Sequence, residues 1–183
     1  MSAHKIWRTL LGIWLSGWVF SFALVGGPPQ SGKDSWAAWQ FVLGDWVGEG
    51  SGEPGAATSE FSFHPALDGK ILIRKNRTDI HATGEHPAST HEDMLVVYPE
   101  GSDMRAIYFD NEGHVIHYTA SFSADGNKLT FLSATLPSAP RMRLTYEKSK
   151  NGALNISFDI APPGKPEAFS THIGGTAHRK APH

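Results

Sequence analysis

Cysteine is absent from the 183 residues of this chain. Its absence excludes disulfides, thiolate metal sites, a cysteine nucleophile and a lipid-modified cysteine at a mature N-terminus. A charge excess of either sign is also lacking, because 16 Lys and Arg stand against 18 Asp and Glu, for a formal net charge of −2. Such a balance gives no electrostatic footprint for nucleic acid or an anionic membrane surface. We therefore expect neither as a partner.

Familiar catalytic motifs are missing as well. The chain has no Gly-x-Ser-x-Gly elbow, phosphate-binding loop, dinucleotide fingerprint or His-Glu-x-x-His helix. The sequence therefore favours no enzyme class, and one enzymatic alternative stays open. In a hydrolase or isomerase, Asp93 or Asp110 could form an acid–base pair with His117 if their side chains entered a barrel from neighbouring strands.

Long hydrophobic runs are absent except near the N-terminus. Lys5 and Arg8 precede an apolar run over residues 10–25. This run is short for a spanning helix, which needs about 20 residues. We expect residues 1–27 to be a signal peptide, or an uncleaved anchor that makes the only membrane contact, and residues 28–35 to be a linker. The folded part is then exported, either periplasmic or secreted.

Short β-like segments fill most of the remaining chain. Residues 36–43 predict a brief helical turn, and we count roughly nine or ten strands after it. Turn sequences such as Asp68-Gly69 and Asn151-Gly152 separate them. Many short antiparallel strands with little helix predict an all-β sandwich or a closed barrel.

Glycine recurs at every second position of the first predicted strand. Gly48, Gly50 and Gly52 follow the sequence Gly-Asp-Trp at 44–46. Alternate residues of a strand share a face, so these glycines remove the side chains from one face only. Glycine inside a strand indicates a bend or the close approach of other atoms. The pattern predicts a tightly coiled strand, as at the start of a small barrel.

Hydrophobic alternation assigns the faces of two late strands. Their apolar residues alternate with polar ones and are expected to point inward. These residues are Met142, Leu144, Tyr146, Leu154, Ile156, Phe158 and Ile160. In segment 105–110, Ile107 and Phe109 alternate with Tyr108 and Asp110, so the two pairs are expected on opposite faces. The pattern does not decide which polar side chains enter the barrel.

Polar residues that enter the barrel would orient a small ligand there. The candidate ligand-binding residues are Arg74, Asn76, Tyr108, Asp110, His117 and Tyr118.

A helical turn before Gly-x-Trp, with a basic residue on the last strand, resembles the calycin superfamily of lipocalins, fatty-acid-binding proteins and nitrobindins. The matching residues are Gly44, Trp46 and Arg179. In that superfamily the arginine covers the indole and closes one end of the barrel, and a guanidinium over an indole gains a cation–π contribution. The resemblance implies a closed antiparallel up-and-down barrel of about 8–10 strands over residues 36–181, with a short helical plug.

Two groups within the superfamily resemble this chain more closely. Secreted bacterial proteins of unknown function are similar in the Gly-x-Trp-x-Gly-x-Gly start and in the Tyr-Phe-Asp-x-Glu-Gly hairpin at 108–113. Nitrobindins share the first motif and bind haem through a histidine near the C-terminus. The segment 172–179 resembles their ending, which implies His172 as a proximal haem ligand.

The ten histidines give no predicted metal site. His114 and His117 are three apart, so on a strand they would point to opposite faces and could not easily hold one ion. A second group lies in a predicted polar loop and could bind zinc only if the loop folded its members together. Its members are His81, His86, His91, Glu92 and Asp93. We expect a solvated loop there.

The sequence thus favours an exported barrel that binds a small, mostly apolar molecule in its interior. Haem binding through His172, a hydrolase or isomerase, and a purely structural module are the alternatives, and the ligand's identity stays open.

Overall fold

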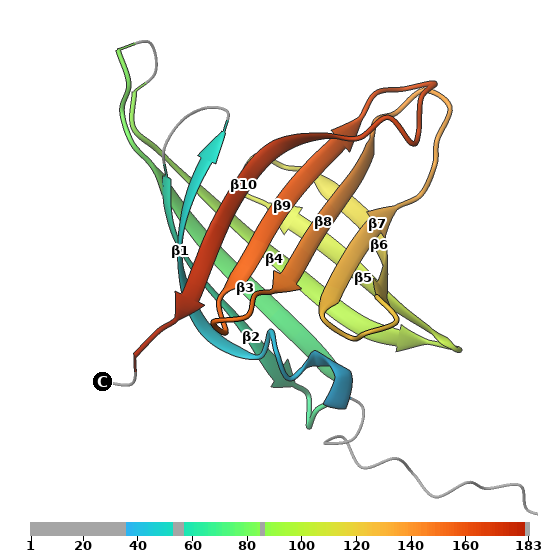
Figure 1. The fold of residues 1–183 in the computed structure, drawn as a ribbon. Coiled ribbons are helices and arrows are strands. Elements are labelled where there is room, and N and C mark those ends of the chain that lie inside the picture. The colour runs from blue at the N-terminus through green and yellow to red at the C-terminus, as the bar shows by residue number, and fades with distance from the viewer. Residues whose placement is uncertain (1–35, 53–56, 85–86, 182–183) are drawn as a thin grey trace, which may run out of the picture.

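A computed structural model describes residues 36–52, 57–84 and 87–181 (Figure 1). The predicted leader and linker lie outside these residues. In the described part, the 3₁₀ turn η1 (Ala37–Trp39) precedes ten strands. The strands are β1 (Gly44–Gly52), β2 (Ala57–Ala66), β3 (Ile71–Ile80), β4 (Ser89–Glu100), β5 (Asp103–Asp110), β6 (Val115–Phe122), β7 (Lys128–Ser133), β8 (Arg141–Lys148), β9 (Leu154–Ala161) and β10 (Ser170–Arg179). None of the helices described is long and apolar enough to cross a membrane.

The strands form one closed barrel. Each strand pairs antiparallel with the next one in sequence, and β10 returns to pair with β1 (Figure 1). Closure leaves no free sheet edge, which removes the unpaired backbone groups of an open sheet. The predicted all-β, up-and-down barrel is therefore confirmed, and the sandwich alternative is excluded.

A cluster of aromatic side chains seals one end of the barrel. Trp36 precedes η1 and Trp39 is its last residue, and both are 2% exposed. The Trp36 indole N–H donates to the Gly69 carbonyl at 2.8 Å, and the Trp39 ring meets the Phe122 ring edge-on at 5.2 Å between centroids. The expected helical turn thus exists and acts as a plug.

Trp46 and Arg179 join the two ends of the barrel sequence. They are direct partners in the β1–β10 ladder, and the Arg179 guanidinium lies 4.6 Å from the Trp46 ring centre. Arg179 also donates to the Leu43 carbonyl at 2.7 Å. A side chain on Gly44, whose φ is +98°, would start 3.0 Å from this guanidinium, so glycine suits both the backbone and the space. The two residues expected to close the barrel are therefore in contact at the β1–β10 seam.

Gly48 meets the close neighbours that its position predicts. A Cβ atom there would lie 2.8 Å from the Ser59 hydroxyl of β2 and 3.4 Å from the Ala177 side chain of β10. The missing side chain lets these two flanking strands approach β1 on its inner face.

The predicted inward faces of β8 and β9 are also confirmed. Leu154 and Tyr146 are fully buried, and Ile156, Phe158 and Ile160 border the interior cavity described below. On β5 the structure decides what the pattern left open, because Tyr108 and Asp110 line the cavity while Phe109 is 39% exposed on the outside.

The β3–β4 hairpin is longer than the sequence predicts. His91, Glu92 and Asp93 were expected in a polar loop, but they lie on β4 and pair with Thr78, Arg77 and Asn76 of β3. The prediction of a solvated loop at these positions was wrong. Polar residues extend both strands here because their side chains bond across the ladder, including Arg77 to Glu92 at 2.8 Å.

Candidate functional site: a two-sided cavity in the barrel

The barrel encloses a cavity of about 580 Å³ in the half away from the plug. One wall comes from β8 and β9 and is apolar. It is made of Met142, Leu144, Ile156, Phe158 and Ile160. The facing wall comes from β3, β4 and β5 and is mostly polar. It contains Arg74, Asn76, Thr78, His91, Asp93, Tyr108 and Asp110.

An ion pair lies at the inner end of the polar wall. Arg74 donates to the Asp93 carboxylate, and their side chains are 9% and 4% exposed. Asn76 donates to the second Asp93 oxygen at 2.8 Å. Burial lowers the pKa of Arg74, but Asp93 and the surrounding tyrosines outweigh this and raise it, so the guanidinium stays charged. Its Nε is buried and has no acceptor within hydrogen-bonding distance among the described residues.

Two protonated tyrosine hydroxyl groups lie near this ion pair, because Tyr118 lines the cavity and Tyr146 is fully buried in the core. Burial raises the pKa of both phenols, for Tyr146 to about 12, and the nearby Arg74 charge lowers it by less. A contact with the Arg74 side chain also lowers the pKa of Tyr146, by less than burial raises it. Both groups therefore act as neutral hydrogen-bonding groups at physiological pH.

These tyrosines should make the free energy of unfolding decrease at alkaline pH. A phenol whose pKa is raised by folding stabilises the folded state fully below its unfolded pKa of about 10, and this contribution is lost as pH rises through the folded value. We expect the urea midpoint to fall between about pH 9 and 12, and Tyr146→Phe to reduce that fall. Tyrosinate absorbance measured alongside denaturation checks this. Early ionisation of all four tyrosines with the fold intact would contradict it.

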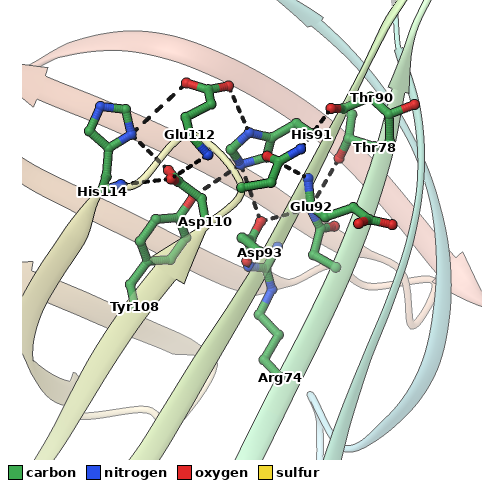
Figure 2. Close-up of polar contacts among 12 residues, drawn as sticks. Arg74, Thr78, Thr90, His91, Glu92, Asp93, Tyr108, Asp110, Glu112 and His114 are labelled. Atoms are coloured by element: carbon green, nitrogen blue, oxygen red, sulfur yellow. Dashed lines mark hydrogen bonds and ion pairs between the residues drawn. The ribbon is translucent and has the colours of Figure 1, made fainter.

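A group of imidazoles and carboxylates surrounds the cavity mouth (Figure 2). His91 of β4 contacts Glu112 through Nδ1 at 3.1 Å and the Tyr108 hydroxyl through Nε2 at 3.0 Å. Its pKa is raised by the hydrogen bond to Asp93, and burial lowers it by less. His114 contacts Asp110 through Nδ1 at 2.9 Å. We name His91, Asp110, Glu112 and His114 the mouth cluster.

Asp110 is fixed by the turn that follows β5. One of its carboxylate oxygens accepts backbone N–H groups from Glu112 at 3.0 Å and His114 at 2.8 Å. Burial raises the pKa of Asp110, but the bonds from His114 and Glu112 lower it by more, so the group is ionised at neutral pH.

Five of the six predicted ligand-binding residues do line the cavity, and one does not. His117 is exposed on the outer face of β6, between the cavity-lining Ile116 and Tyr118. The acid–base pair of His117 with Asp93 or Asp110 is therefore not formed, because these carboxylates point inward. His114, in contrast, borders the cavity, which confirms that His114 and His117 cannot share one ion.

His172 lies at an irregularity of β10. The β9–β10 register shifts between Thr171 and Ile173, so His172 is the extra residue. It borders the cavity, with its ring 6.4 Å from that of Phe158, and within the described residues no hydrogen bond holds the imidazole. A bulge of this kind re-aims a side chain that regular alternation would place elsewhere.

Sequence reasoning did not place His91 and Glu112 in this cavity, and it placed Asp93 there only in the enzymatic alternative. A signal was present, because His91 and Asp93 alternate with Thr90 and Glu92 as on a strand. It was weak, since neither set is apolar.

Comparison with known proteins identifies the fold alone. No family model matches the chain, and no curated protein sequence does. Among solved structures, the chain is similar to the crystal structure of Rv2717c from M. tuberculosis, with a TM-score of 0.60 and 17% sequence identity, over 80% of this chain and 98% of that one. This likeness supports the barrel.

Proposed function

We propose that this protein is an exported, calycin-like barrel that binds a small, mostly apolar molecule with one polar end in its interior. The observation that carries the proposal is the two-sided cavity, apolar on β8–β9 and polar on β3–β5. Its volume of about 580 Å³ is within the usual range for small-molecule pockets. The contact between Trp46 and Arg179 supports the calycin assignment, and the N-terminal apolar run supports export.

The charges of the cavity-lining residues determine which polar group a ligand can carry. Arg74 is the sole Lys or Arg among the described lining residues, and Asp93 already neutralises it. Asp110 and Glu112 add two negative charges. A carboxylate ligand would therefore meet net repulsion, whereas a hydroxyl or carbonyl oxygen could form hydrogen bonds with the polar wall without bringing in a charge.

Binding of matched probes tests this proposal. Native mass spectrometry and calorimetry would compare a medium-chain alcohol, amine and carboxylic acid of equal length. We expect the alcohol to bind, and the acid to bind at least about tenfold more weakly, a difference of 1.4 kcal/mol. A folded protein that binds none of the three overturns the proposal.

Two variants of β9 separate the cavity from the outer surface. Ile156→Trp fills the cavity from its apolar wall and should abolish probe binding, with Ile156→Phe as a milder replacement. Asn155→Trp introduces the same side chain on the exposed face of the same strand and should leave binding unchanged. Equal losses in both would locate binding outside the cavity.

Haem is a second candidate ligand, favoured by His172. Its imidazole reaches the cavity from a bulge, is held by no hydrogen bond in the described chain, and lies beside the apolar wall that would face a macrocycle. An imidazole is a suitable axial ligand for haem iron. We expect a Soret band on haem addition that His172→Ala abolishes and His178→Ala, on the exposed face of β10, retains. The absence of a band in the wild type overturns this candidate.

A further inference from the structure

We propose that His91, Asp110 and Glu112, with His114 as a fourth ligand, bind a zinc-like divalent metal ion at the mouth of the barrel. One ligand atom from each of His91, Asp110 and Glu112 lies within 4.8 Å of the others. They come from β4, from β5 and from the turn after β5, so that the β4–β5 ladder and a hairpin hold them together (Figure 2).

The spacing of the ligand atoms suits one small ion. Around a tetrahedral zinc ion with bonds of about 2.0–2.2 Å, ligand atoms are separated by about 3.3–3.6 Å. In the mouth cluster, His91 Nδ1 is 3.1 Å from a Glu112 oxygen, and His114 Nδ1 is 2.9 Å from Asp110 and 3.9 Å from Glu112. Small movements of Glu112, which is 60% exposed, would admit the ion.

The outer contacts of these side chains match those of metal ligands. His91 keeps Nδ1 toward the cluster, while Nε2 faces the Tyr108 hydroxyl at 3.0 Å and Asp93 at 3.5 Å. A hydrogen bond from the second ring nitrogen to a carboxylate fixes the tautomer and orientation of a ligating imidazole. Asp110 is similarly anchored, because two backbone N–H groups hold one oxygen and leave the other facing the cluster.

Charge balance is an independent argument for a cation. The Asp110 side chain is 3% exposed, and among the described residues no Lys or Arg pairs with it or with Glu112. The ion-pair partner of Asp110 is the His114 imidazole, which carries a charge only when protonated, so a bound cation would stabilise this carboxylate. The two carboxylates together carry the charge that one divalent ion would neutralise. Elsewhere on the barrel, the His64–Asp45 pair is exposed, and the described part of the chain offers it no third ligand.

Titration with Zn²⁺ alone tests the proposal. The chain, purified without a polyhistidine tag and treated with chelator, should bind one Zn²⁺ per molecule. Asp110→Asn and His91→Gln, which preserve side-chain size, should each weaken this binding at least about 10–100-fold, the effect of losing even an outer partner of a ligand. Circular dichroism verifies that both variants fold.

Matched histidine variants serve as controls. His64→Gln removes a His–Asp contact of 3.0 Å on the surface, and His117→Gln removes an imidazole from the outer face of β6. Both should bind zinc like the wild type, and so should His172→Ala, which separates this site from haem binding. No zinc binding, a loss in only one of the two ligand variants, or equal losses in the controls would each overturn the site and leave a network of hydrogen bonds.

Discussion

Replacing Asp93 with asparagine should lower the free energy of unfolding by about 3–5 kcal/mol, the cost of removing one partner from a buried ion pair. The Arg74 and Asp93 side chains are 9% and 4% exposed, and Arg74 has no other ion-pair partner in the described chain. The variant therefore leaves a charged guanidinium in the barrel interior without a counter-charge. Urea denaturation at neutral pH measures the loss.

A double variant separates the effect of the buried charges from the effect of side-chain volume. Arg74→Met combined with Asp93→Leu should recover most of the lost stability, because apolar residues of similar volume often replace a buried pair without cost. It should keep the preference for alcohol over acid, because Asp110 and Glu112 still repel a carboxylate. Glu92→Gln, which removes an exposed pair with Arg77 on the same two strands, should change stability little. Equal losses in Asp93→Asn and Glu92→Gln would contradict the interior role.

Replacing Trp46 with alanine should lower stability by about 3–5 kcal/mol, as other buried aromatic truncations do. Trp46 is 1% exposed, its indole N–H donates to Val42 at 2.9 Å, and its ring stacks on Phe61 with the centroids 6.2 Å apart. The substitution leaves a cavity beside the β1–β10 seam and leaves Arg179 without its aromatic partner. Thermal and chemical denaturation both report the change.

Neighbouring substitutions show whether the indole itself matters. Val47→Ala changes the next residue of β1, which is 39% exposed, and should stay within about 0.5 kcal/mol of the wild type. Arg179→Met removes the cation–π contact and should cost about 0.5–1 kcal/mol, plus its hydrogen bond to Leu43. If Trp46→Ala costs no more than Val47→Ala, closure of the barrel does not depend on this residue.

Much of the barrel could be predicted because its sequence signals lie within single turns and strands, or link a residue of the first strand with one of the last. Turn sequences such as Asp68-Gly69 coincide with the observed hairpins, and Leu67 and Asp68 adopt the positive φ values of 50° and 54° that a tight turn requires. Alternation on β8 and β9 gave the correct inner face because one face there is apolar and has to be removed from water.

The polar wall could not be predicted in the same way. On β3, β4 and β5 both faces carry polar side chains near the mouth, so hydrophobic alternation does not distinguish inside from outside. Asp110 and His117 illustrate this, because the sequence paired them and the structure separates them across the sheet.

The sequence by itself determined an all-β chain, because turn chemistry and apolar alternation are encoded in short segments. The resemblance to calycins implied in addition that the first and last strands meet through Trp46 and Arg179. Tertiary structure alone decided that His91, Asp93, Asp110 and Glu112 share one cavity. Their convergence depends on the register of β3, β4 and β5 within a closed sheet, and register is fixed by the neighbouring strands.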